Sequence, residues 1–173
     1  MKKGRMSVSA FLAQYEHEVE IVIKLLFSFI VGGIIGFERE KLKKPVGFRT
    51  YVLVCLGSTV VTIVGLETVN YTINLVMENP DVLKDALGVD TVRLTAQVVS
   101  GIGFIGAGAI INHKSNVTGL TSAASIWVAS MIGIAIGYGY YFVATVATLL
   151  VLLALVLSTF KHYYDHSQED EWD

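Results

Sequence analysis

Charged side chains that could bind an ion follow the first long apolar run of the sequence. Glu38, Arg39 and Glu40 come directly after that run, and Arg49 lies just before the second run. A carboxylate surrounded by other oxygens can hold a hard cation such as Mg²⁺ through the waters of the ion, which makes Glu38 the candidate metal ligand. Two other interpretations stay open, namely solvated loop charges and an ion pair between Glu38 and Arg49 across the loop.

Polar side chains also interrupt a glycine-rich apolar stretch at residues 97–127. Small and hydroxyl residues recur there on helical faces, and such faces let helices approach closely and bond across their contact. One interpretation is helix packing alone. The other is a polar pocket formed by Gln97, Ser100, Asn112, Thr121 and Ser125.

The glycines of this stretch match a nucleotide-binding pattern, Gly101-x-Gly-x-x-Gly106. That pattern needs a preceding strand and a soluble crossover helix, whereas these glycines lie inside an apolar run of membrane length. They would then serve helix packing, as we expect for two Gly-x-x-x-Gly pairs elsewhere, or local unwinding of the helix around a ligand. The expected packing glycines are Gly32, Gly36, Gly101, Gly103, Gly106, Gly108, Gly133 and Gly137.

Catalytic chemistry is not indicated by the histidines or by the single cysteine, Cys55. His162 and His166 have a spacing that can bind a transition metal on a helix, but they lie in a polar tail. All four histidines lie in tails or loops, and no nucleophile stands beside a base. We expect neither an enzyme nor a resident cofactor, and Mg²⁺ only as a ligand or substrate.

The composition indicates that these side chains are positioned by helices that lie in a membrane. The 173 residues are 53% hydrophobic and only 16% charged, with a net charge of −2, and the mean hydropathy is +0.60. Soluble domains carry about 25% charged residues. The predicted fold is all-α, a polytopic bundle of five transmembrane helices at residues 21–37, 51–66, 94–111, 119–137 and 140–159. Residues 1–20 are expected to form a polar tail with a short interfacial helix, the alternative being a disordered tail. Residues 67–93 are expected to form a loop, 112–116 a tight turn, and 160–173 an acidic tail.

The distribution of Lys and Arg predicts the orientation. Residues 38–50 carry five basic residues, and Lys114 and Lys161 would lie on the same side. The opposite side would carry five, at Lys2, Lys3, Arg5, Lys84 and Arg93. Because basic loops stay in the cytoplasm, we expect the N-terminus outside and the C-terminus in the cytoplasm.

Four segments carry a resemblance to a known family. GGIIGFERE (32–40), GFRT (47–50), R-x-x-AQVVSGIGFIGAGAI (93–110) and GLTSAASIW (119–127) resemble, in the same order, the MgtC/SapB family of bacterial inner-membrane proteins. The resemblance implies five helices with the N-terminus outside. It also implies a role in adaptation to low magnesium, connected in some members with virulence.

The resemblance adds Thr50 to the candidate residues and carries two functional expectations. One is a protein of Mg²⁺ homeostasis that binds or transports the ion. The alternative is a regulatory module that modulates another membrane complex, such as the ATP synthase or a P-type ATPase. The complete candidate polar or ion site is Glu38, Arg39, Arg49, Thr50, Gln97, Ser100, Asn112, Thr121 and Ser125.

Two departures from the family pattern limit these expectations. Thr118 stands where many members have an arginine, which puts any charge pairing there in doubt. The short tail after the last apolar run also suggests the membrane domain without a soluble C-terminal domain. Expected partners are the lipid bilayer and a homo-oligomer (a dimer) or a larger membrane complex, with no nucleic acid.

Overall fold

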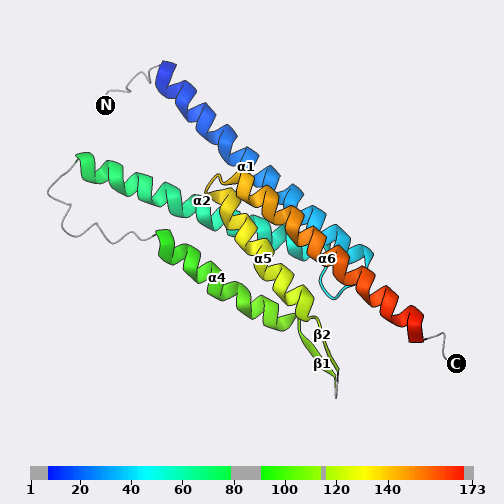
Figure 1. Cartoon of the computed structure of the whole chain (residues 1–173). Coiled ribbons are helices and arrows are strands. Elements are labelled where there is room, and N and C mark those ends of the chain that lie inside the picture. Colours follow the sequence, from blue (N-terminus) through cyan, green and yellow to red (C-terminus); the bar gives the residue numbers. More distant parts are fainter. Residues whose placement is uncertain (1–7, 79–90, 114–115, 170–173) are drawn as a thin grey trace.

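The computed structural model describes residues 8–78, 91–113 and 116–169. These residues form five helices and one short β-hairpin (Figure 1). The helices are α1 (Val8–Lys41), α2 (Phe48–Glu78), α4 (Thr91–Gly108), α5 (Leu120–Gly137) and α6 (Tyr141–Glu169). The hairpin pairs β1 (Ile111–His113) with β2 (Asn116–Thr118) in an antiparallel register.

Helix α5 lies at the centre of the bundle. It packs against α1, α2, α4 and α6, and α2 packs in turn against α1 and α4. Ile126, Ala129 and Ile136 of α5 are completely buried, as are Ile35 of α1 and Tyr51 of α2. The apolar core therefore follows α5, while many aliphatic side chains elsewhere on the helices face outward, as expected for a protein solvated by lipid.

Three of the helices are long and apolar enough to cross a membrane: Tyr15–Lys41, Phe48–Glu78 and Leu120–Gly137. Over its described residues, α6 has a shorter apolar part, Tyr141–Leu157. The helical fold is confirmed, whereas membrane crossing stays a prediction for all five helices, with α1, α2 and α5 meeting the requirement of length and hydropathy. Helix α4 is about 27 Å long at 1.5 Å per residue, but polar residues in its first half lower its hydropathy.

Several predicted boundaries differ from the structure. Helix α1 runs without interruption from Val8, so the predicted interfacial helix and the first span are one element. Helix α2 extends to Glu78, although residues 67–93 were expected to form a loop. Val69, Ile73 and Val76 have helical spacing there, and the Thr72 hydroxyl donates to the carbonyl of Thr68 at 2.8 Å.

The elbow after α4 is a β-hairpin rather than a tight turn between helices. Helix α4 ends at Gly108, and Ile111 pairs with Thr118. Gly119 then enters α5 with a φ of 89°, and a Cβ at this position would overlap the carbonyl oxygen of Ala109. Only glycine fits there, because the backbone is left-handed and the space is already filled.

Candidate functional site

The bundle has one end at which the α1–α2 loop, the end of α4 and the hairpin meet (Figure 1). Helix α1 stops at this end because Lys43 adopts a φ of 52° and Pro45 follows it. The amide of Lys44 donates to the carbonyl of Arg39 at 3.0 Å, which closes the turn. The Glu40 carboxylate then accepts a hydrogen bond of 2.9 Å from the amide of Phe48, so α1 caps the first turn of α2.

A buried arginine lies just inside this end. Arg39 is 2% exposed, and its guanidinium donates to both carboxylate oxygens of Glu38, with the Nη2 bond at 2.6 Å. Tyr51 lies within electrostatic range of both residues. Its hydroxyl lies 2.5 Å from Ser125 Oγ, and Ser125 donates to the carbonyl of Thr121. Ser125 Oγ therefore accepts from Tyr51, which ties α2 to α5.

A polar seam continues from this point along the contact of α1, α2 and α5. Thr59 Oγ1 lies 2.8 Å from both Ser28 Oγ and the carbonyl oxygen of Gly133. Ser58 and Ser130 share a hydrogen bond of 2.7 Å. Among the described residues, no buried side-chain nitrogen or oxygen lacks a partner. The seam is thus a closed set of hydroxyl bonds that joins helices, with no donor left over for a ligand.

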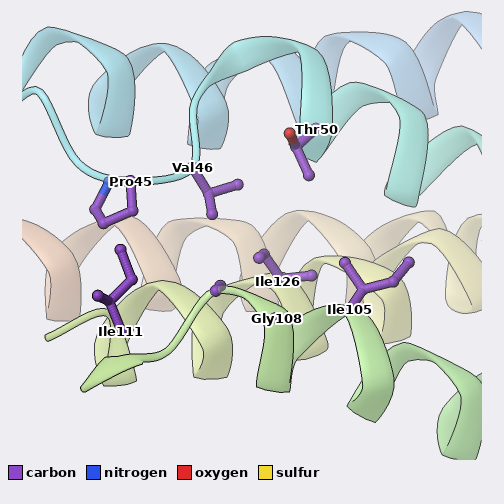
Figure 2. Close-up of a pocket in the computed structure, with 8 residues that line it drawn as sticks. Pro45, Val46, Thr50, Ile105, Gly108, Ile111 and Ile126 are labelled. Carbon is purple, nitrogen blue, oxygen red and sulfur yellow. The ribbon is translucent and has the colours of Figure 1, made fainter. Parts of the chain in front are cut away.

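An apolar cavity of about 230 Å³ lies between the α1–α2 loop and the α4–hairpin corner. Figure 2 shows Pro45, Val46 and Thr50 on one side of it, and Ile105 and Ile111 on the other. Among the described residues that line it, Thr50 alone has a polar side-chain group, its hydroxyl. The cavity gives this end of the bundle a concave surface, but its side chains offer few groups that could bind an ion.

A second hollow, of about 500 Å³, continues along the contact of α2 and α4. Thr50 and Ile105 line both hollows, so the two form one groove. Farther along, Gly57 and Val61 of α2 face Gly101 of α4. The groove is nearly all aliphatic, which suits an apolar chain better than a hydrated cation.

The predicted site residues are brought together only in part. Glu38 and Arg39 pair with each other, instead of Glu38 with Arg49, because Arg39 lies buried beside it while Arg49 is exposed. Ser125 bonds to Tyr51, and Thr50 lines the groove. The predicted polar pocket does not form, because four of its members are exposed, leaving Ser125 as its buried residue. The four exposed residues are Gln97, Ser100, Asn112 and Thr121.

The predicted packing glycines divide into two groups. A Cβ at Gly32, Gly36, Gly133 or Gly137 would press into α2. On α4, Gly106 approaches Ala123 of α5, with an added Cβ 3.5 Å from the Ala123 carbonyl oxygen. The other three meet no atom within 4 Å, so the structure does not use them for packing within this chain: Gly101, Gly103 and Gly108.

The described part of the chain contains no cluster of side chains that could bind a metal ion. No group of three or more His, Cys, Asp or Glu side chains there could hold a metal ion. The carboxylate of Glu38, the candidate ligand, is already engaged by Arg39. His162 and His166 lie on α6 where the side chains fall outside the described residues.

Tyr51 is the residue that pattern reasoning missed. It is completely buried, its hydroxyl bonds to Ser125, and it lies within electrostatic range of Glu38 and Arg39. The signal was a tyrosine one residue after Arg49-Thr50, at the start of an aliphatic run. Buried tyrosines usually find a partner for their hydroxyl, which would have pointed to a polar contact here.

Comparisons with known proteins agree on one family. The MgtC family profile matches residues 25–164. An Escherichia coli K12 protein, YhiD, whose name describes it as a candidate magnesium transporter, is 41% identical over 145 residues. Protein SapB of Bacillus subtilis strain 168 is 36% identical over 137 residues, and protein MgtC of Salmonella typhimurium LT2 is 35% identical over 136.

These alignments cover most of this chain but less of the relatives. They take in 82%, 79% and 79% of this chain, and 63%, 55% and 51% of YhiD, SapB and MgtC. The chain thus spans between about half and two thirds of the length of these relatives. No solved structure matches it.

Proposed function

This chain belongs to the MgtC family, and from that premise we propose that it is a non-enzymatic, multi-pass protein of the bacterial inner membrane that supports Mg²⁺ homeostasis and adaptation to low magnesium. The observation that carries the proposal is its 41% identity to a protein named as a candidate magnesium transporter. Its apolar helices of membrane length are consistent with this role.

Binding or transport of Mg²⁺ is the first way in which the protein would act. The supporting feature is the charge next to the concave end of the bundle. Exposed Arg49 directly precedes Thr50 of the cavity lining, and the carbonyl of Arg39, the partner of Glu38, accepts from the amide of Lys44 next to Pro45. A hydrated Mg²⁺ needs only one or two carboxylates, but it keeps several waters. Conduction would therefore require the apolar groove to open and admit water.

A regulatory contact with another membrane protein is the second candidate, favoured by a specific observation. Phe104 of α4 is 85% exposed, and its neighbour Gly103 has open space around it. A large side chain beside a glycine makes a surface onto which a second transmembrane helix can pack closely. The partner would be another copy of this chain or a larger membrane complex.

Flux measurements separate the two candidates. The full chain is placed in liposomes that contain a Mg²⁺-sensitive dye, and a Mg²⁺ gradient is applied. Transport predicts flux above that of empty liposomes, and Arg49→Ala and Glu38→Gln should both change it. Glu78→Gln is the matched control, since it removes an exposed carboxylate at the far end of α2.

Absence of flux, with folded protein inserted in both orientations, contradicts transport. The regulatory candidate then predicts a specific cross-link from a photoreactive residue at position 104 to one partner protein. Cross-links to lipid alone would contradict that second candidate.

A further inference from the structure

The groove between α2 and α4 has the length of one leaflet of a bilayer. Along α2 it runs from Thr50 to Val61, which is about 17 Å at 1.5 Å per residue. The hydrocarbon core of a bilayer is about 30 Å thick, so the groove covers about half of it. A transmembrane helix needs the full thickness, whereas a lipid acyl chain extends through one leaflet. The length therefore favours an acyl chain as the occupant.

Positive charge is concentrated at one end of this groove. Lys44 directly precedes Pro45, and Arg49 directly precedes Thr50, both of which line the cavity at that end. Lys44 and Arg49 are exposed, as are Lys41 at the end of α1 and Lys43 in the loop. This arrangement sets basic side chains at headgroup level, beside an apolar channel that leads toward the middle of the membrane.

The acidic residues at the end of α1 cancel only part of this charge. Both oxygens of Glu38 accept from Arg39, and Glu40 accepts from the amide of Phe48 at 2.9 Å. Because the partner of Glu40 is a neutral amide, its carboxylate keeps its charge and offsets one of the four exposed basic residues, Lys41, Lys43, Lys44 and Arg49. A net positive charge therefore remains at this end to meet an anionic group of the membrane surface. A basic segment near anionic lipid gains about 1 kcal/mol per Lys or Arg, which is about a fivefold change in binding for each residue.

We propose that this groove binds one anionic phospholipid. One acyl chain lies between α2 and α4, against Gly57, Val61 and Gly101, and the phosphate lies beside Lys44 and Arg49. Gly57 and Gly101 make the channel wide, because a Cβ at either position would meet nothing within 4 Å. The inference goes beyond a role in Mg²⁺ homeostasis and does not depend on ion flux.

Native mass spectrometry of the full chain in a mild non-ionic detergent tests the proposal. Dioleoyl phosphatidylglycerol and dioleoyl phosphatidylcholine are titrated separately, so that only the headgroup charge differs. The wild type should retain phosphatidylglycerol at least tenfold better. Lys44→Gln and Arg49→Gln should each weaken phosphatidylglycerol binding about fivefold, and Arg49→Lys should restore it.

Filling the groove should abolish binding without unfolding the protein. Gly101→Leu puts a large side chain into the hollow, while Gly103→Leu puts the same side chain into open space on the same helix outside it. We expect Gly101→Leu to lose phosphatidylglycerol at least tenfold and Gly103→Leu to bind like the wild type. Circular dichroism checks that both variants keep their helix content.

Three results would overturn the proposal. The first is equal retention of the two lipids by the wild type. The second is an equal effect of Gly101→Leu and Gly103→Leu on lipid binding. The third is a dimer that Gly101→Leu dissociates while lipid binding is unchanged, since the groove would then hold a second copy of the chain.

Discussion

The pair formed by Glu38 and Arg39 places a charged group in the interior of a membrane protein. The side chain of Arg39 is 2% exposed and that of Glu38 is 19% exposed. The guanidinium of Arg39 donates two hydrogen bonds to the Glu38 carboxylate. Charges at membrane depth are costly unless they are paired. The two residues therefore stabilise the bundle as a unit, and neither is tolerated well without the other.

A double-mutant cycle checks this dependence. Glu38→Gln should lower the free energy of unfolding by about 3 kcal/mol, the lower end of the cost of breaking a buried pair, because Glu38 is partly exposed. The combined variant Glu38→Gln/Arg39→Met should be more stable than Glu38→Gln alone, since no buried charge is left unpaired. Unfolding is followed by circular dichroism during a denaturant titration in micelles. If the cost of Glu38→Gln is the same with Met at position 39, the pair is not coupled.

Helix contacts depend on glycines that the sequence alone does not distinguish. Gly133 of α5 packs directly onto α2, where an added Cβ would overlap the carbonyl oxygen of Cys55 and lie 3.0 Å from Ser58 Cβ. A Cβ added at Gly103 of α4, in contrast, would meet no atom within 4 Å. Gly133→Ala should therefore cost about 1–3 kcal/mol, since backbone atoms have to move.

The matched variant Gly103→Ala should be neutral, or stabilising by up to about 1 kcal/mol, because alanine is the better helix former. The same micelle titration measures both variants. An equal loss of stability would mean that α4 packs as closely as α5, in contradiction to the open space at Gly103. A loss of dimer in Gly103→Ala, with unchanged monomer stability, would instead point to a contact between copies.

Sequence patterns predicted the helices well and their rotations poorly. The apolar runs gave five helices, and the pairs Gly32-x-x-x-Gly36 and Gly133-x-x-x-Gly137 do face another helix. Ser125 was expected to share a polar pocket with Gln97 and Ser100 of the third apolar run, yet it bonds to Tyr51 of α2. A stripe of small residues says that a helix can be approached closely, but the partner is chosen by packing of the whole bundle.

The candidate site was predictable to a similar extent. The shared edge of the 38–50 loop and the α4–α5 elbow is present, since Pro45 and Ile111 line one cavity. Neither the presence nor the absence of the polar pocket could be predicted, because the exposure of Gln97 and Thr121 depends on how α4 and α5 are rotated about their axes. The helical period of a sequence shows which residues share one face of a helix, but it does not show which neighbouring helix that face contacts.

Loops at the two ends of the bundle make the orientation of the whole molecule testable. Lys44 and Asn112 belong to the end that carries the cavity, next to Pro45 and Ile111. Tyr140 lies in the α5–α6 turn at the other end, directly after Gly139. A Cβ added at Gly139 would lie 3.8 Å from the Cε atom of Lys24 in α1. Figure 1 shows the hairpin and the α5–α6 turn at opposite ends of α5. If α5 crosses the membrane, Lys44 and Asn112 lie on one side and Tyr140 on the other.

Cysteine labelling in spheroplasts tests that arrangement. Cys55, the only cysteine, is buried and is first replaced by alanine. Single cysteines at 44, 112 and 140 then meet a membrane-impermeant maleimide. Because residues 38–50 hold five basic residues, their side should be cytoplasmic, so only Tyr140→Cys should react before the membrane is permeabilised. The reverse pattern would overturn the orientation predicted from charge, and different labelling of positions 44 and 112 would overturn their place at one end of the bundle.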